Sequence, residues 1–351
     1  MNRRERRART AVSVGSYDVS FNRAVALMVA RRHAEAEIEL RAALAAKRTL
    51  EAQHNLGTVL VELGRLKEAI QAYRAALRLA PDSQRTHNSL VKPLVDLGRL
   101  EEAQRHGTRA LELKDVEATA EFERYRATFR PRPPASAPPR RRLIAYSLWG
   151  AQGVYVDGSL QNAERAVKLY PGWTCRFYLD DTVPAAAVAS LAQAGAEIVT
   201  MPRPAADRPY DGLFWRFLAA DDPAAELVLF RDCDSLLNER EGAAVEAWLA
   251  SGRTAHVMRD HVLHCDLMLA GLWGVRATKL PLLAEAIAAW IAANPHPLNA
   301  RVQDQVFLRH AVWPLIREDQ LTHDSVYRVF GAEPFPNEGP ELGKRDVVPR
   351  A

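Results

Sequence analysis

The sequence predicts a chain of two parts, an α-helical repeat array followed by an α/β domain with a mostly parallel sheet. Three features predict it: a repeat of 33–34 residues within residues 17–129, a proline-rich stretch at 130–140, and alternating strands and helices over 141–351. A length of 351 residues suits two domains, because single domains usually span roughly 100–200 residues.

Alanine pairs seven residues apart recur through the first part. They are Ala36 with Ala43, Ala69 with Ala76, and Ala103 with Ala110. Gly64 and Gly98 stand before the second helix of their units, where a tight turn is needed, and Pro81 ends a helix. The pattern resembles the tetratricopeptide repeat, a helix–turn–helix unit of about 34 residues that buries its apolar face only by stacking on its neighbours. The first unit lacks the turn glycine, and Val116–Phe129 is expected to supply a closing helix.

The charge of the chain is uneven. Residues 1–140 hold 26 Lys and Arg against 17 Asp and Glu, whereas residues 141–351 hold 21 against 26. Five of the arginines fall within the first nine residues, which predicts a solvated basic tail over residues 1–16 rather than a nucleic-acid surface. We therefore expect no nucleic-acid partner.

Three widely spaced cysteines do not make a disulfide framework and fit a reducing compartment. Polar residues interrupt the stretch after the basic start, and no run approaches 18 apolar residues. These features predict a cytoplasmic protein without a transmembrane segment. The stretch 130–140 holds five prolines in eleven positions, which predicts a semi-extended linker.

Beyond residue 141 the pattern alternates between strands and helices. Strands are expected at 142–148, 174–179, 196–200 and 227–230, and helical segments at 159–169, 184–194 and 214–219. Open sheets of this kind bind ligands beyond the carboxyl ends of their strands.

The apolar strand Leu227–Phe230 runs into Arg231 and then into two aspartates, Asp232 and Asp234. Mg²⁺ or Mn²⁺ is commonly held by one or two carboxylates together with substrate phosphates, so the pair predicts a metal site. Taken alone, the same tripeptide also fits two solvated carboxylates in a turn.

Upstream of the strand lies Leu213-Phe214-Trp215-Arg216-Phe217, an aromatic segment that carries one arginine. This order of helix, strand and Asp-X-Asp is similar to the glycogenin and lipopolysaccharide-galactosyltransferase families of GT-A-type glycosyltransferases. The resemblance implies that Arg216 and Asp232 contact a nucleotide sugar. The alternative for Arg216 is a salt bridge on a helix surface.

Downstream segments extend the resemblance. Gly271 lies in a small-residue turn of the kind that lines the sugar site, and Asp304-Gln305 resembles the Asp-Gln pair near the donor sugar. His323 stands where the family supplies its third metal ligand, beside Asp232 and Asp234. Val306 replaces the usual acidic residue, and an asparagine expected later is absent. A helix cap is the alternative role for Asp304, and a surface position is the alternative for His323.

Five further residues complete the predicted site. The first strand holds the nucleotide base in these families, which implies roles for Tyr146, Ser147 and Trp149. Asp260 is a candidate sugar-binding or general-base carboxylate, and His261 a candidate substrate contact. A zinc site around His261 lacks the usual ligand spacing.

The predicted function is metal-dependent transfer of a glycosyl group, most simply a hexosyl group, from a UDP- or GDP-sugar to a protein or glycan acceptor. Mn²⁺ or Mg²⁺ is the expected cofactor, Asp304, Gln305 and Asp260 the expected catalytic residues, and the repeats are expected to recruit a protein partner. Kinship with the glycogenin-type families would imply retention of the anomeric configuration. The competing hypothesis is a non-catalytic interaction protein with a degenerate transferase-like domain. Nucleotidyl transfer is disfavoured because Gly150–Gly158 contains no Lys or Arg.

Overall fold

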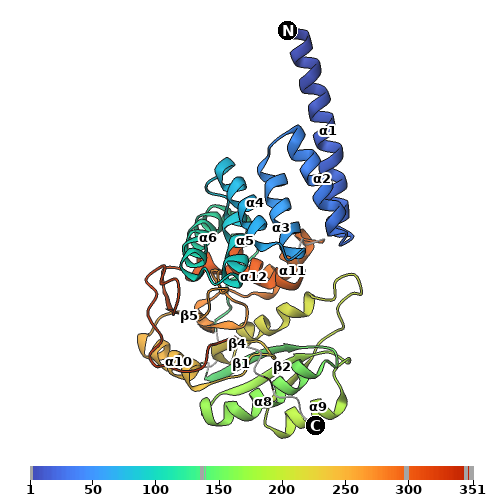
Figure 1. The fold of residues 1–351 in the computed structure, drawn as a ribbon. Helices are drawn as coiled ribbons and strands as arrows, with labels where there is room; N and C mark the ends of the chain where they lie inside the picture. The colour runs from blue at the N-terminus through green and yellow to red at the C-terminus, as the bar shows by residue number, and fades with distance from the viewer. Residues whose placement is uncertain (1–2, 135–137, 139, 296–299, 344–346, 348–351) are drawn as a thin grey trace. The chain divides into compact units, whose positions relative to one another are not determined.

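The structure is a computed structural model that describes residues 3–134, 138, 140–295, 300–343 and 347. It divides into two compact units, Met1–Leu113 and Lys114–Ala351, which are described separately (Figure 1). No helix among the described residues is both long enough and apolar enough to cross a membrane.

The first unit is a series of antiparallel helix pairs, which confirms the predicted helical repeats. The helices are α1 (Arg3–Val29), α2 (His33–Ala46), α3 (Leu50–Glu62), α4 (Leu66–Leu79), α5 (Gln84–Asp96) and α6 (Leu100–Glu121). The helix α1 begins within the segment that the sequence predicted to be a solvated tail. The six paired alanines have no exposed surface, so these small side chains let the two helices of each unit pack closely.

Three turns between paired helices need the left-handed conformation. Gly64 and Gly98 adopt it with φ of 73° and 70°, as their placement predicted. In the first unit the equivalent position, two residues before α2, is occupied by Arg31 with φ of 56°. The degenerate first unit therefore keeps the turn geometry with a residue that is strained there.

The division between the units falls within α6, upstream of the proline-rich segment. The final turns of α6 pack inside the second unit, where Asp115 accepts hydrogen bonds from Trp313 and Arg317. Arg130 pairs with Leu282 in an isolated β-bridge, so the start of the proline-rich segment lies along the second unit in extended form. Residues 135–137 and 139 of that segment lie outside the described residues.

The second unit is built on a seven-stranded sheet in the order β3-β2-β1-β4-β6-β5-β7. The strands are β1 (Arg141–Leu148), β2 (Thr174–Leu179), β3 (Glu197–Thr200), β4 (Ala225–Arg231), β5 (Ala255–Arg259), β6 (Leu272–Arg276) and β7 (Gln320–Asp324). Among the described strands of this sheet, only the pairings of β6 with β4 and β5 are antiparallel, which confirms the predicted mostly parallel sheet.

Helices pack against the strands of the sheet. The regular helices are α7 (Glu123–Arg126), α8 (Gly153–Leu169), α9 (Ala185–Gln193), α10 (Glu239–Ser251), α11 (Ala284–Ala293), α12 (Gln303–Phe307) and α13 (Trp313–Ile316). Segments of 3-10 helix occur at η1 (Asp211–Asp221), η2 (Ala277–Lys279) and η3 (Ala300–Val302), and a π-helix occurs at η4 (Leu308–Val312). The helices α8 and α9 lie side by side against the β1–β2 half of the sheet (Figure 1). The aromatic segment around Arg216 forms the 3-10 helix η1 rather than an α-helix.

Candidate functional site

The candidate site lies where the order of the strands reverses. The strand β1 pairs in parallel with β2 on one side and with β4 on the other, and the chain visits β2 and β3 before it returns to β4. Crevices at such reversals, outside the carboxyl ends of the strands, are where open α/β sheets bind ligands. Ser147 near the end of β1 and Asp232 directly after β4 stand at this point. The predicted site stays a prediction, and its residues lie at a position where sheets of this kind bind ligands.

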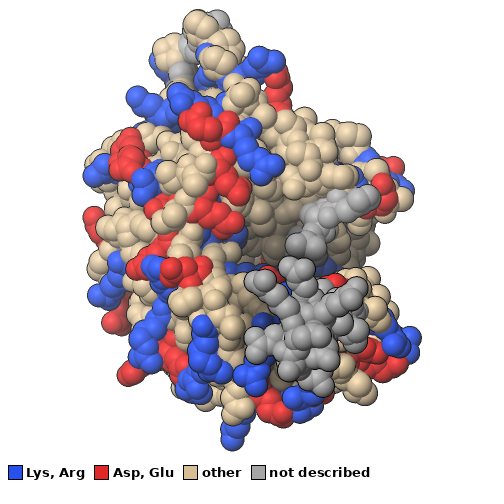
Figure 2. Space-filling model, turned by 90° about the horizontal axis from the view of Figure 1, so that it is seen from above, with Lys and Arg blue, Asp and Glu red and all other residues tan. Residues whose placement is uncertain are grey.

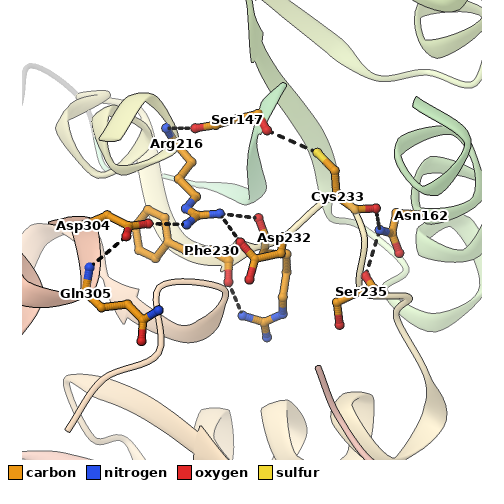
Figure 3. A network of polar contacts seen from close by, with 10 residues as sticks. Ser147, Asn162, Arg216, Phe230, Asp232, Cys233, Ser235, Asp304 and Gln305 are labelled. Atoms are coloured by element: carbon orange, nitrogen blue, oxygen red, sulfur yellow. Dashed lines mark hydrogen bonds and ion pairs between the residues drawn. The ribbon is translucent and has the colours of Figure 1, made fainter. Parts of the chain in front are cut away.

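The loop Asp232-Cys233-Asp234 follows a path that neighbouring elements fix (Figure 3). Asn162 of α8 is fully buried, donates from Nδ2 to the carbonyl of Ser235 at 3.0 Å, and accepts from the backbone N–H of Leu237 at 2.9 Å. The thiol of Cys233 donates to the carbonyl of Ser147 at 3.3 Å. These bonds tie the loop to both β1 and α8, so the two aspartates are held on a rigid support.

Two glycines allow close approaches around this loop. A Cβ added to Gly158 of α8 would lie 2.0 Å from the carbonyl oxygen of Cys233. A Cβ added to Gly271 would lie 2.1 Å from Oδ2 of Asp232. Both distances are too short for a real Cβ. Glycine at position 158 therefore lets α8 approach the loop, and glycine at position 271 leaves space for the Asp232 carboxylate. The role of Gly271 in the candidate site stays a prediction. Its position beside Asp232 explains why glycine is needed there.

Arg216 joins two carboxylates that are 72 residues apart in the sequence (Figure 3). Its guanidinium donates to Oδ1 of Asp232 at 2.5 Å and to Oδ2 of Asp304 at 2.8 Å. Its backbone N–H donates to Oγ of Ser147 at 3.0 Å, which links η1 to the end of β1. The structure thus brings together Ser147, Arg216, Asp232 and Asp304, four of the residues that the sequence singled out.

The members of this network differ in their access to solvent. The side chains of Arg216 and Asp304 are each 3% exposed, whereas that of Asp232 is 46% exposed. The arginine is therefore not the helix-surface salt bridge considered as an alternative, and Asp232 is the member open to a ligand. Burial raises the pKa of Asp304 to about 6, against the opposing effect of the Arg216 charge. Asp304 is not an N-cap either, because that position of α12 is Val302.

Gln305 contributes to the network through its backbone. Its N–H donates to Oδ1 of Asp304 at 2.9 Å, while its side chain points away from Arg216 (Figure 3). Trp149 lies half-buried at the end of β1, with its ring 6.0 Å from that of Trp215 in an edge-on contact. It therefore lies next to η1, and its predicted contact with a substrate stays a prediction.

Tyr146 is not available to a substrate. Its side chain is fully buried and stacks on Phe177 with ring centroids 4.7 Å apart. Side chains alternate along a strand, so placing Ser147 toward Arg216 turns Tyr146 into the core on the other face. The structure therefore contradicts the predicted substrate-binding role of Tyr146.

His323 is not brought to the aspartates. It lies in β7, three strands from β4, which corresponds to roughly 14 Å at the usual strand spacing of about 4.8 Å. It is 1% exposed, and its Nδ1 lies 2.8 Å from Nε2 of His256, with burial lowering the pKa of His323 to about 4. It is therefore neither a third ligand placed with Asp232 and Asp234 nor a surface histidine.

Asp260 and His261 instead anchor a later segment of the chain. Oδ1 of Asp260 accepts from Arg240 at 2.8 Å, and its Oδ2 accepts from the backbone N–H of Leu342 at 3.0 Å. His261 lies 3.5 Å from the carboxylate of Glu341. Because both oxygens of Asp260 are engaged in holding the chain, the structure does not place this carboxylate as a free base in the candidate site.

Sequence reasoning missed the buried polar group behind the loop. Arg231, the last residue of β4, donates to Glu241 at 2.6 Å and to the carbonyl of Trp273 at 2.8 Å, and Tyr170 donates to the same carboxylate at 2.8 Å. The one signal in the sequence was a charged residue that ends an otherwise apolar strand. Its partner lies in α10, and spacing alone could not identify it.

Comparison with known proteins identifies the repeats. Residues 50–83 match the family model of the tetratricopeptide repeat. This chain carries a tetratricopeptide repeat. The matched segment covers α3 and α4, the unit that holds Gly64 and its paired alanines. A comparison with curated proteins found no match to the chain.

Two solved structures illustrate what the chain resembles. A mutant of MamA aligns at 28% identity over 28% of this chain and 72% of that one, with a TM-score of 0.27. A mutant of the O-GlcNAc transferase of Thermobaculum terrenum aligns at 18% identity over 63% of this chain, with a TM-score of 0.32. The alignment covers 51% of the transferase chain, so this chain matches about half of its length.

Proposed function

We propose that the second unit transfers a glycosyl group from a nucleotide sugar, with the donor diphosphate bound at Asp232 and Asp234. The observation that carries the proposal is the placement of these carboxylates, on a pinned loop, at the strand-order reversal between β1 and β4. The guanidinium of Arg216 in η1 bonds to Asp232 of this loop and to Asp304 of α12, and its backbone N–H bonds to Ser147 of β1. This arrangement is the one that we expect of a GT-A-type domain.

The residues present fit a metal that the substrate helps to hold. Among the described residues no group of three or more His, Cys, Asp or Glu side chains is placed to bind an ion. Asp232 offers an exposed carboxylate, and Asp234 follows it two residues later. Mg²⁺ is often bound by one or two carboxylates plus substrate phosphates, so Mg²⁺ or Mn²⁺ would be held by these two aspartates and the donor. When bound, the ion would neutralise charge on the leaving diphosphate.

The chain's own residues would act by positioning and electrostatics. Arg216 holds Asp232 and Asp304 in one orientation, and its charge compensates two carboxylates that would otherwise repel each other. Gly271 leaves space for the Asp232 carboxylate. Retention of configuration, as in the glycogenin-type families, and the recruitment of a protein partner or acceptor by the repeats are further parts of the proposal.

The experiment is thermal unfolding followed by tryptophan fluorescence, with Mn²⁺ and UDP or GDP added separately and together. All seven tryptophans lie at or after Trp149, so the signal reports the second unit alone. At a nucleotide concentration a hundred times the dissociation constant, the expected stabilisation is about 2.7 kcal/mol, or about 5–10 °C. The shift should need both metal and nucleotide and should vanish in Asp234→Asn.

A matched control is Asp96→Asn, which removes one exposed carboxylate from α5 of the first unit and should keep the full shift. If no nucleoside diphosphate shifts the unfolding temperature of the unchanged chain, the transferase proposal is wrong. The chain would then be better described as a repeat protein with a non-catalytic α/β unit.

A further inference from the structure

The third helix pair of the first unit brings two histidine side chains together. His87 lies in the first turn of α5 and His106 in the second turn of α6. Their ring centroids are 5.0 Å apart, and their two Nδ1 atoms face each other at 2.8 Å. His87 is buried, whereas the side chain of His106 is 19% exposed, so water can reach one edge of this contact. We call these two residues the histidine pair.

The outer nitrogen of each ring faces an oxygen that can only accept a hydrogen bond. Nε2 of His87 lies 2.9 Å from the carbonyl oxygen of Pro81, so this nitrogen carries a proton and donates it. Burial lowers the pKa of His87 and keeps its ring neutral, which leaves Nδ1 with a lone pair. Nε2 of His106 faces the carboxylate of Glu102 at 3.9 Å. The two rings therefore present equivalent nitrogens to each other and equivalent nitrogens to acceptors.

Protons alone do not satisfy all of these contacts. The two Nδ1 atoms need one proton between them, and only His106 can supply it, because Nδ1 of His87 has a lone pair. Burial lowers the pKa of His106 to about 4, so near neutral pH its ring has a single proton. With that proton on Nδ1, Nε2 of His106 turns a lone pair toward the carboxylate of Glu102. A cation between the two Nδ1 atoms removes this conflict, because both Nε2 atoms are then protonated.

The geometry selects the kind of cation. A histidine that binds a metal almost always donates its other ring N–H to a carbonyl or a carboxylate, and both rings of the histidine pair are oriented in this way. Imidazole nitrogen suits Zn²⁺, whereas Mg²⁺ and Ca²⁺ prefer oxygen. Zn–N bonds of about 2.0–2.1 Å in a tetrahedral site place the two nitrogens about 3.3 Å apart, so the rings would separate by about 0.5 Å. Water would complete the coordination at the exposed edge of His106.

The charges around the histidine pair are already compensated. Glu102 accepts from Arg74 at 2.5 Å and also pairs with Arg99. Arg109 pairs with Asp82 at 2.7 Å. Basic and acidic side chains are likewise interspersed over the face of the chain that Figure 2 shows. Because no surplus of carboxylates surrounds the pair, an ion would be held by the imidazole nitrogens rather than by net negative charge.

We propose that the histidine pair binds a Zn²⁺ ion through the two Nδ1 atoms, and that the ion cross-links α5 to α6. Nε2–H of His87 would donate to the carbonyl of Pro81, and Nε2–H of His106 would point to the carboxylate of Glu102. The site lies in the first unit and is separate from the Mg²⁺ or Mn²⁺ proposed for the second unit. The inference does not depend on glycosyl transfer.

The first test is calorimetric titration of the full chain, without an affinity tag, with ZnCl₂ and then with MgCl₂. We expect a Zn²⁺ site that His106→Gln removes and that Mg²⁺ does not occupy. The matched control is His33→Gln, which removes a half-buried histidine from α2 and should keep the site. The titration is repeated in Asp234→Asn, where the same Zn²⁺ site should remain. Circular dichroism of each variant shows whether its helices are intact.

The second test detects the position of the protons and needs only the unchanged chain for its result. NMR of a chain with ¹⁵N-labelled histidine distinguishes protonated from unprotonated ring nitrogens. Without metal, His87 should carry its proton on Nε2 and His106 on Nδ1. Zn²⁺ should move the proton of His106 to Nε2, and Mg²⁺ should not. His87→Gln and His106→Gln each remove one set of signals and so assign them.

Glu102 provides a test of the positioning contact. Removing the partner of a metal-binding histidine typically weakens metal binding by about 10–100-fold, so Glu102→Ala should weaken Zn²⁺ binding by about tenfold or more. Glu112→Ala removes another carboxylate of α6, one that pairs with Arg109 at 2.8 Å, and should leave the Zn²⁺ affinity unchanged.

Three results would overturn the inference: no binding of Zn²⁺ by the unchanged chain, binding that survives His106→Gln, or histidine ring nitrogens at which Zn²⁺ moves no proton. Equal binding of Mg²⁺ at the histidine pair would also contradict it. None of these results bears on nucleotide binding by the second unit, which the melting experiment measures separately.

Discussion

Replacing Asp304 by asparagine should change how the stability of the second unit depends on pH. Asp304 is 3% exposed, and burial raises its pKa from 3.8 to about 6 despite the adjacent Arg216. In the folded chain this carboxyl therefore keeps its proton up to about pH 6, whereas in the unfolded chain it loses it near pH 4. Between these values the folded state binds more protons, so stability falls as pH rises.

The size of the effect follows from the two pKa values. A difference of about two units, at 1.36 kcal/mol per unit, corresponds to about 3 kcal/mol of stability lost between pH 4 and pH 7. Asparagine keeps an oxygen that can accept from Arg216 but does not ionise. The Asp304→Asn variant should therefore lack this loss, and the difference in unfolding free energy between variant and parent should move by about 3 kcal/mol in favour of the variant from pH 4 to pH 7.

The assay is urea unfolding followed by tryptophan fluorescence at several pH values, since all the tryptophans lie in the second unit. Asp266→Asn is the control of opposite sign, because Lys114 and Arg309 offset burial and lower the pKa of Asp266 to about 2. The stability that ionised Asp266 contributes is present above pH 4 and is lost only as the pH falls toward 2. The Asp266→Asn variant should therefore lose a constant amount of unfolding free energy from pH 4 to pH 7. Parallel pH profiles for Asp304→Asn and the parent would refute the reasoning.

Three further changes test separate parts of the structure. Gly271→Ala places a Cβ 2.1 Å from Oδ2 of Asp232, so it should displace this carboxylate, destabilise the second unit by about 1–3 kcal/mol and remove the nucleotide-dependent melting shift; an unchanged shift would contradict the contact. Asn162→Ala leaves the buried N–H of Leu237 without its acceptor and should cost about 1–3 kcal/mol in urea unfolding, whereas Asn88→Ala in the first unit should leave the fluorescence transition unaltered. Arg31→Gly relieves a left-handed arginine and should stabilise the first unit by about 1 kcal/mol in unfolding followed by far-ultraviolet circular dichroism; destabilisation would show that the arginine is not strained.

The sequence predicted the elements whose signal is local. Periodic alanines and turn glycines marked the repeats, and the strand at 174–179 was predicted with its observed bounds. The loop Asp232-Cys233-Asp234 could be placed at a sheet edge because a buried strand must deliver its next residues there. The predicted helix around Arg216 is a 3-10 helix, because apolar spacing over a short segment does not distinguish the two.

The sequence could not predict contacts that depend on which strands are neighbours. The position of His323 in the sequence suits a third metal ligand. However, β7 pairs with β5 at the far edge of the sheet, and the imidazole of His323 contacts His256 there. Asp260 lies close to a histidine in the sequence, yet its partners come from α10 and from Leu342. Tyr146 and Ser147 are adjacent and face opposite sides of β1, so only the register of the strand separates a core residue from a site residue.

The central claim is that Asp232 and Asp234 bind the diphosphate of a sugar donor for transfer. The most direct measurement is the release of nucleoside diphosphate or monophosphate from a panel of UDP-, GDP- and CMP-sugars, with Mn²⁺ or with a chelator, by the full chain and by Asp234→Asn. The account predicts release from a UDP- or GDP-sugar that needs the metal and is lost in Asp234→Asn but kept in Asp96→Asn. Equal release by the parent and Asp234→Asn across the whole panel would contradict it.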